Sequence, residues 1–401
     1  MTPPATPTAS RGSVLAAHAV LPHHGQLAAS VVAAPMAGLS AAAQRLAPLL
    51  GALSAREVED QLGPGLLCRP FVTADLVGIQ VECAVSEASL LGRLPEAIAR
   101  APSTTPQLLT VVRSQCARSL ATAASGREAG TEHIQALLFG EHRYAITSAQ
   151  RLAAVTAATA RDVDAALAEL RGAAPIVTVA GLPPGLSATV RALDPVALDN
   201  ATATGRPAGA ARAAPVEVSV PTQRPQYVRG MQGVRLAAPE RYALHLTCAL
   251  LSGHGGLLDR RLREERGLTY ALSAFSRELA EDGYVVMLAT CAADAVRAVR
   301  AGVLDVLSEL AEAVPTDLLE QARQGLVVAH LRATSTAVDV ATRTSSYLAA
   351  GLDPCELFGY SRALALVTPA EVSATAAGVL GRVPVELVLL PDSGTEDHGK
   401  S

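Results

Sequence analysis

Residues 253–270 (GHGGLLDRRLREERGLTY) hold an arginine and a tyrosine whose spacing suits chemistry on a carbonyl group. Gly267 stands where a helix C-cap with positive φ is expected, because glycine adopts that conformation without strain. The pattern predicts a short helix that ends at Gly267 and a strand that begins near Tyr270. Arg263 and Tyr270 would then lie on opposite sides of one turn, where both could donate hydrogen bonds to a single carbonyl oxygen.

A second interpretation of the same residues is a solvated helix face. The segment carries a run of mixed charge, made of Arg260, Arg261, Arg263, Glu264, Glu265 and Arg266. Such runs usually lie at the surface. Spacing alone favours this second interpretation, because charged helix faces are common.

The string LREERGLTY resembles the second-half signature of the pitrilysin/insulinase family of zinc metallopeptidases, the inverzincins. Members of that family carry an Arg and a Tyr at this spacing, which hold the substrate beside the scissile bond. The resemblance therefore assigns Arg263 and Tyr270 to stabilisation of the substrate carbonyl or its oxyanion. It also implies an α+β fold with two homologous pitrilysin-like domains, each a mostly antiparallel sheet packed against helices.

Active members of the family carry HxxEH on an earlier helix, where two histidines bind zinc and the glutamate activates water. The matching helix here follows Ser40, a suitable N-cap, and reads AAAQRLAPLLGAL. Gln44 and Pro48 stand at the histidine positions, and Ala47 stands at the glutamate position. Residues 97–127, where a third ligand would be expected, contain no acidic side chain. The resemblance thus implies a degenerate zinc motif, no metal or other cofactor in this chain, and zinc in a partner subunit.

The length of the chain limits the number of domains, and its composition excludes some classes of function. The chain has 401 residues, enough for about two domains with their own cores. Half of the residues are hydrophobic, only 3% are aromatic, and the net charge is −4. Nucleic-acid binding would require a basic patch with interleaved aromatic residues, so we expect no nucleic-acid partner. Six cysteines without CxxC spacing encode neither a zinc knuckle nor a redox pair.

The location of the protein is predicted from what its segments lack. The start, MTPPATPTASRGS, has no uninterrupted apolar core of the kind found in secretory signals. No later segment offers about 18 apolar residues free of charge and turn formers. We therefore expect a cytoplasmic protein with no membrane partner.

An internal repeat indicates that one α+β unit occurs twice. LFGEHRYA from Leu138 matches LFGYSRAL from Leu357, VTAATARDVDAA from Val155 matches VTPAEVSATAA from Val367, and PIVTVAG from Pro175 matches PVELVLL from Pro384. Residues 201–214 have the small, polar and Pro/Gly-bearing composition of a linker. We predict domains over 1–200 and 215–401, joined by this linker.

Several local elements are specified closely enough to be tested. Strands over 13–21 and 27–35 are predicted to form a hairpin-like pair around His23, His24 and Gly25. A separate short helix is expected over 56–62. Residues 151–170 are expected to form an amphipathic helix with Thr159 as a cap, and Thr316 is expected to cap a later long helix.

The resemblance leads to a specific functional hypothesis. In this family the zinc half and the Arg/Tyr half can lie in separate chains that together enclose an extended peptide. We expect a non-catalytic subunit of a bacterial heterodimeric processing peptidase, similar to the alpha subunit of mitochondrial processing peptidase. Its partner would bear HxxEH, and its substrate would be a peptide of the leader class found on ribosomally made peptides. The alternative is a catalytically inert structural or peptide-binding relative, like the core subunits of respiratory complexes.

Overall fold

The computed structural model describes residues 17–21, 25–99, 105–124, 129–182, 216–220, 224–252 and 255–391. We refer to the residues up to 182 as the N-terminal half and to those from 216 as the C-terminal half. The predicted linker over 201–214 lies outside the described residues, so the domain boundaries at 200 and 215 stay a prediction.

Each half contains one five-stranded mixed sheet. The first comprises β1 (Ala17–Leu21), β2 (Leu27–Pro35), β3 (Leu66–Val72), β4 (Leu76–Ala84) and β5 (Ile176–Ala180), in the order β1-β5-β2-β4-β3. The second comprises β6 (Val216–Val220), β7 (Gln226–Gln232), β8 (Thr269–Glu278), β9 (Gly283–Cys291) and β10 (Val385–Pro391), in the order β6-β10-β7-β9-β8. Among the described strands, the β1–β5 and β6–β10 pairings are parallel and the others are antiparallel. The two orders correspond strand for strand, which confirms the predicted α+β fold of two homologous units.

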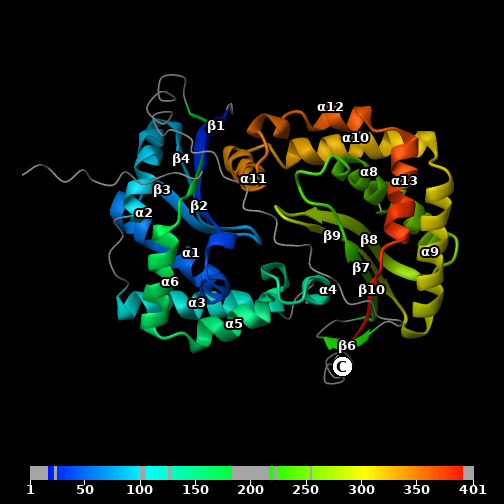
Figure 1. Ribbon diagram of the computed structural model, residues 1–401, viewed down its shortest axis with the longest axis horizontal. Coiled ribbons are helices and arrows are strands. Elements are labelled where there is room, and N and C mark those ends of the chain that lie inside the picture. The colour runs from blue at the N-terminus through cyan, green and yellow to red at the C-terminus, as the bar shows by residue number, and fades with distance from the viewer. Residues whose placement is uncertain are drawn as a thin grey trace, which may run out of the picture.

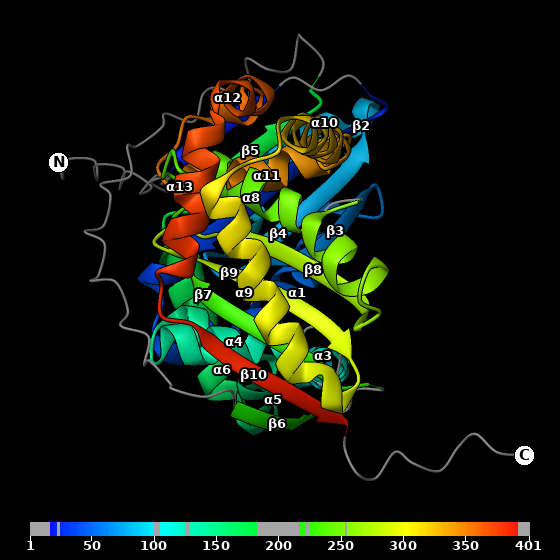
Figure 2. The same cartoon turned by 90° about the vertical axis from the view of Figure 1, so that its right-hand side faces the viewer.

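Helices cover the sheets of both halves (Figure 1). Those of the N-terminal half are α1 (Ala41–Leu62), α2 (Leu94–Ala99), α3 (Pro106–Ala124), α4 (Ala129–Phe139), α5 (Ser148–Ala157) and α6 (Ala160–Gly172). Those of the C-terminal half are α8 (Arg241–Ser252), α9 (Val296–Glu312), α10 (Thr316–Arg332), α11 (Ala337–Ala349), α12 (Tyr360–Leu366) and α13 (Pro369–Leu380). Figure 2 shows α9 and α13 lying over the strands of the second sheet.

The predicted β1–β2 hairpin is wrong, because β5 lies between these two strands. Ala19 of β1 pairs with Thr178 of β5, and Val31 of β2 pairs with the same residue on its other side. Strand β2 is buried along nearly its whole length, so it needs a hydrogen-bonded neighbour on each side. Those neighbours are β4 and β5.

Two predicted helix boundaries also change. The helix after Ser40 does not stop before a separate helix at 56–62, because α1 continues through Pro48 to Leu62. Residues 151–170 instead divide at Ala158, which is extended, so that α5 ends and α6 begins. The predicted cap is confirmed, since the Thr159 and Asp162 side chains form a capping box. Thr316 is the first residue of α10, and Pro315 is its N-cap.

The two halves exchange one helix each. In Figure 1, α4 of the N-terminal half lies beside the second sheet, where it packs on β7 and β10. Helix α11 of the C-terminal half packs on β2 and β5 of the first sheet. There the Thr178 hydroxyl donates to the Ala341 carbonyl at 2.8 Å. A Cβ atom on Gly230 would clash with Ile134 of α4, so a glycine is needed for this close approach.

A partly buried polar cluster joins the halves at a second place. Asp75, in the turn between β3 and β4, binds Arg143 at 3.0 Å and the Tyr144 hydroxyl at 2.6 Å. Its other carboxylate oxygen accepts from the Ala280 amide in the turn between β8 and β9, at 2.9 Å. Arg143 also binds Glu281 at 2.9 Å. These contacts hold the two hairpin turns together.

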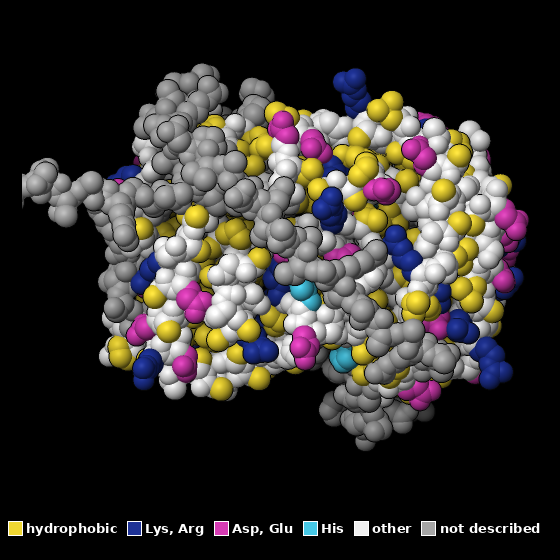
Figure 3. All heavy atoms as spheres, in the orientation of Figure 1, with side chains coloured by type: hydrophobic (Ala, Val, Ile, Leu, Met, Phe, Trp, Pro, Cys, Tyr) yellow, Lys and Arg dark blue, Asp and Glu magenta, His cyan; other side chains and the backbone are white. Residues whose placement is uncertain are grey.

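Within the described ranges, no single helix has both the length and the apolar composition required to cross a membrane. Helices α12 and α13 meet these criteria only when taken together, and they are bent by 91° relative to each other. On the face drawn in Figure 3, positive and negative side chains are interspersed over the described surface.

Candidate functional site

The segment that carries Arg263 is anchored to the core of the C-terminal half. A short π-helix covers Asp259–Glu264, and its neighbour Leu258 and its own Leu262 are fully buried. Gly267 then takes φ +61°, and its amide donates to the Arg263 carbonyl at 3.1 Å. The predicted positive φ at Gly267 is confirmed, although the C-cap residue of the π-helix is Glu265. Strand β8 begins two residues after Gly267.

Arg263 lies at the surface beside this turn. Its guanidinium contacts Asp259, one turn earlier, at 3.3 Å, and its side chain is 56% exposed. Exposed ion pairs at this spacing are worth about 0–1 kcal/mol. The guanidinium can therefore exchange Asp259 for another acceptor at little cost.

Tyr270 occupies an irregular position on the edge strand β8. The register with β9 shifts between Thr269 and Ala271, so Tyr270 is the extra residue of a β-bulge. Bulges re-aim side chains and are common next to active sites. The Tyr270 side chain is 58% exposed, and the Arg224 guanidinium lies 4.1 Å from its ring centroid.

The structure gives the two predicted residues different partners on opposite sides of the Gly267 turn. Their surroundings also fit part of the surface-face interpretation, since Arg261 pairs with Glu265 at 3.2 Å and with Glu309 at 3.1 Å. The assignment of Arg263 and Tyr270 to a substrate carbonyl stays a prediction. Arg224 is a residue that sequence spacing misses, because it precedes β7, far from Tyr270 in the chain.

The positions that match HxxEH lie in the first half of α1. The Gln44 side-chain amide donates to the carbonyls of Met36 at 3.0 Å and Leu39 at 2.9 Å. Ala47 is fully buried and Pro48 is partly buried. Neither Ala47 nor Pro48 has a side-chain donor atom for a metal, so these residues do not fit zinc. The described residues also include no group of three or more His, Cys, Asp or Glu that could hold a metal ion.

Arg151 compensates for the proline inside α1. Pro48 has no amide hydrogen, so the carbonyl of Gln44 lacks its helical partner. The Arg151 guanidinium of α5 donates to that carbonyl at 3.0 Å. Burial lowers the pKa of Arg151 from its ordinary value, although Glu132 opposes this shift. The helix is thus maintained by a contact from another element.

Replacement of Arg151 by methionine should lower the free energy of unfolding by about 1–3 kcal/mol, the usual cost of an unsatisfied buried acceptor. In a Pro48→Ala background, the restored amide can bond the Gln44 carbonyl, so the same replacement should cost about 1 kcal/mol less. Chemical denaturation of the wild type, the two single variants Arg151→Met and Pro48→Ala, and the double variant measures the coupling between the two positions. Arg56→Met, at an exposed surface pair, should change stability by about 0.5 kcal/mol or less. An equal loss in both backgrounds would show that Arg151 does not replace the amide.

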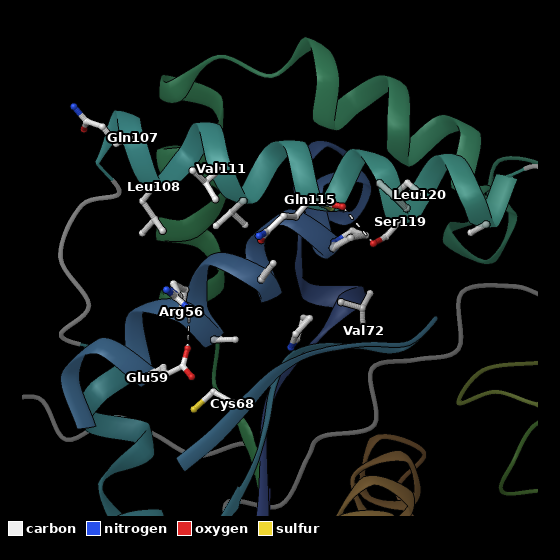
Figure 4. Close-up of a pocket in the computed structure, with 17 residues that line it drawn as sticks. Arg56, Glu59, Cys68, Val72, Gln107, Leu108, Val111, Gln115, Ser119 and Leu120 are labelled. Atoms are coloured by element: carbon white, nitrogen blue, oxygen red, sulfur yellow. Dashed lines mark hydrogen bonds and ion pairs between the residues drawn. The ribbon is translucent and has the colours of Figure 1, made fainter. Parts of the chain in front are cut away.

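A cavity of about 830 Å³ lies between α1, α3 and strand β3 (Figure 4). Pro48 lines it, so it adjoins the helix positions that match the zinc motif. The lining is largely aliphatic and includes Leu108, Val111 and Leu120 of α3. The cavity cannot be predicted from local residue patterns, because its walls come from segments that are distant in the chain.

Comparisons with known proteins agree with this architecture. Residues 198–326 match the family model described as Peptidase M16 inactive domain. No curated protein matches the chain. Among solved structures, a protease from Helicobacter pylori is similar with a TM-score of 0.74 and 13% identity, over 93% of this chain and 96% of that chain.

Two further structures share the fold at low identity. A peptidase M16 inactive domain from Pseudomonas fluorescens has a TM-score of 0.73 and 16% identity, over 95% of this chain and 96% of its own. A chain of Complex III2 from Candida albicans, in an Inz-5-bound structure, has a TM-score of 0.74 and 12% identity, over 94% of each chain. Residues 198–326 are thus similar to the Peptidase M16 inactive domain, and the fold of these solved structures is shared along most of the chain.

Proposed function

We propose that this chain is the non-catalytic subunit of a heterodimeric zinc metallopeptidase. It would bind an extended peptide and position it for cleavage by a partner that bears HxxEH. The observation that carries the proposal is the contrast between the two halves. Arg263 and Tyr270 are both present and exposed beside the Gly267 turn, whereas Gln44, Ala47 and Pro48 leave the matching zinc helix without ligands.

The proposed peptide-binding mode is addition to a sheet edge. Strands β3 and β8 stand last in the described order of their sheets, so each has backbone groups on one side with no strand partner in its sheet. An extended peptide can bind such an edge through main-chain hydrogen bonds, while pockets for alternate side chains provide selectivity. A leader peptide of a ribosomally made peptide is the substrate class that we propose, with the complex in the cytoplasm.

The alternative function is a structural subunit without a role in cleavage. Similarity to a chain of Complex III2 concerns the fold and is compatible with either function. The Arg263 and Tyr270 pair favours the peptidase subunit, because a scaffold has no chemical requirement for these two donors at this spacing.

The chain purified alone is expected to bind no stoichiometric zinc and to cleave no peptide, because no side chain of the degenerate motif can activate water. Co-expressed with an HxxEH-bearing partner, for example one encoded by a neighbouring gene, it should elute as a heterodimer with one zinc. Size-exclusion chromatography with metal analysis of each peak measures both outcomes.

The partner with its HxxEH glutamate replaced by glutamine is the matched control, which should assemble but not cleave. About one tightly bound zinc per isolated chain would contradict the proposal. A chain that stays monomeric beside every such partner would remove its main support.

A further inference from the structure

The cavity between α1 and α3 has one wall made by an edge strand. Cys68, Pro70 and Val72 of β3 all line it, as expected for alternate residues that share a face of a strand. The intervening Phe71 is buried on the other face, in the cluster that includes α11. Pro70 suits this place, because proline cannot donate to a ladder and is confined largely to edge strands.

A peptide strand laid against β3 would therefore direct every second side chain toward the cavity. Figure 4 shows the opposite wall, where Leu108 and Val111 of α3 face the space above β3. Val111 is 55% exposed, so part of the aliphatic wall is in contact with water. An apolar occupant would remove this surface from water.

The polar groups of the lining favour an uncharged occupant. Among the described residues that line the cavity, Arg56 and Glu59 are the charged ones, and they pair with each other at 3.1 Å. The thiols of Cys68 and Cys116 are protonated near neutral pH, because burial raises the pKa of each to about 11. A charged side chain placed against the aliphatic part of the lining would lose hydration.

We propose that this cavity receives one apolar side chain, of the leucine, phenylalanine or tryptophan class, from a peptide that lies along β3. The inference rests on the proposed function, since it specifies the substrate class of the same peptide-binding subunit. The helix whose family counterpart binds zinc has thus become part of a selectivity pocket. The aliphatic lining and the alternate β3 residues carry this assignment.

A peptide panel tests the inference with the full chain. The probes are blocked heptapeptides of threonine and serine with one central guest residue. Because the protein has no tryptophan, the emission of a tryptophan guest reports on the peptide alone. We expect this emission to shift to the blue on binding. The leucine guest should compete about tenfold or more better than the aspartate guest.

Val111→Glu should weaken binding of the tryptophan peptide about tenfold or more, because it places a charge in the cavity wall. The matched control is Val328→Glu on α10. Val328 is 49% exposed and lines a separate cavity between α8 and α10, so this variant should bind as wild type does. Both sites are exposed, and the melting temperatures of the two variants verify that they remain folded.

Thiol labelling gives a second measurement of occupancy. The tryptophan peptide should slow labelling of Cys68 and Cys116, which line the cavity, but not of Cys355, which is exposed on the C-terminal half. Mass spectrometry of the three sites measures this difference. Equal protection of all three would place the peptide elsewhere and overturn the inference.

The outcomes separate this inference from the function on which it rests. If all guest residues bind equally, peptide binding stands but the side-chain pocket is disproved. If no peptide binds to the chain, both the pocket and the proposed peptide-binding role are disproved. If Val328→Glu weakens binding and Val111→Glu does not, the pocket lies between α8 and α10, and the assignment to β3 is wrong.

Discussion

The Tyr270→Phe heterodimer is expected to cleave peptide about a hundredfold or more slowly than the wild-type heterodimer, with assembly unchanged. In the proposed complex the phenol donates a hydrogen bond to the substrate carbonyl as it gains negative charge. Loss of one such donor typically costs about 2.7–4 kcal/mol in the transition state. Phenylalanine keeps the ring that packs against Arg224, so the change removes the donor selectively. Single-turnover kinetics of the purified complex measures the effect.

Arg263→Ala should reduce turnover at least as much, because it removes a charge together with its donors. Lysine at this position should restore activity only in part, since a point charge cannot reproduce the planar guanidinium. Arg260→Ala is the matched control, because Arg260 is another exposed arginine of the same run. If the Tyr270→Phe and Arg263→Ala complexes both cleave at the wild-type rate, Arg263 and Tyr270 do not take part in cleavage. That result would favour the structural subunit.

Glu386→Ala is expected to destabilise the chain by about 3–5 kcal/mol, because it leaves a buried arginine without its counter-charge. Glu386 of β10 lies 2.6 Å from Arg229, and both side chains are almost fully buried. It also accepts from the Tyr227 hydroxyl and binds Arg300. Denaturant unfolding measures the loss. Glu309→Ala, at an exposed pair with Arg261, is the control and should cost about 1 kcal/mol or less.

The contribution of Glu386 should depend on pH in a defined direction. Burial raises the pKa of its carboxyl, but the hydrogen bond from Tyr227 and the charge of Arg229 outweigh burial and hold the pKa below its usual value. Its stabilising effect is therefore complete above the unfolded-state pKa, about 4.3, and is lost as the pH falls through the lower folded-state value. The stability difference between wild type and Glu386→Ala should shrink over that acidic range. A difference that does not change with pH would contradict this role.

Features that depend on a few neighbouring residues could be predicted from the sequence. Ser40 caps α1 through the Ala43 amide, Thr159 caps α6, and Gly267 takes positive φ. Each of these depends on groups within about four residues along the chain, so local residue types determine them. The duplication of the α+β unit could be predicted for the same reason, because both copies contain similar local sequence patterns in the same order.

The lack of metal ligands at the positions that match HxxEH is likewise a property of residue types. Alanine and proline at positions 47 and 48 have no side-chain atoms that bind a metal or accept a proton, whatever the fold around them. Sequence therefore excludes the HxxEH role directly. The sequence does not show what residues 44, 47 and 48 do instead, since that depends on the elements that pack against α1.

Long-range packing decided the remaining features. Strand β5 inserts between β1 and β2, and α4 and α11 each cover the sheet of the other half. Arg151 reaches the Gln44 carbonyl, and Arg224 reaches the Tyr270 ring. These partners are far apart in sequence. Their pairing is determined by the packing of apolar faces against one another, and local residue preference does not specify it. The sequence therefore determined the caps, the repeat and the missing zinc ligands, whereas only the tertiary structure decided the strand order, the helix exchange and the cavity beside β3.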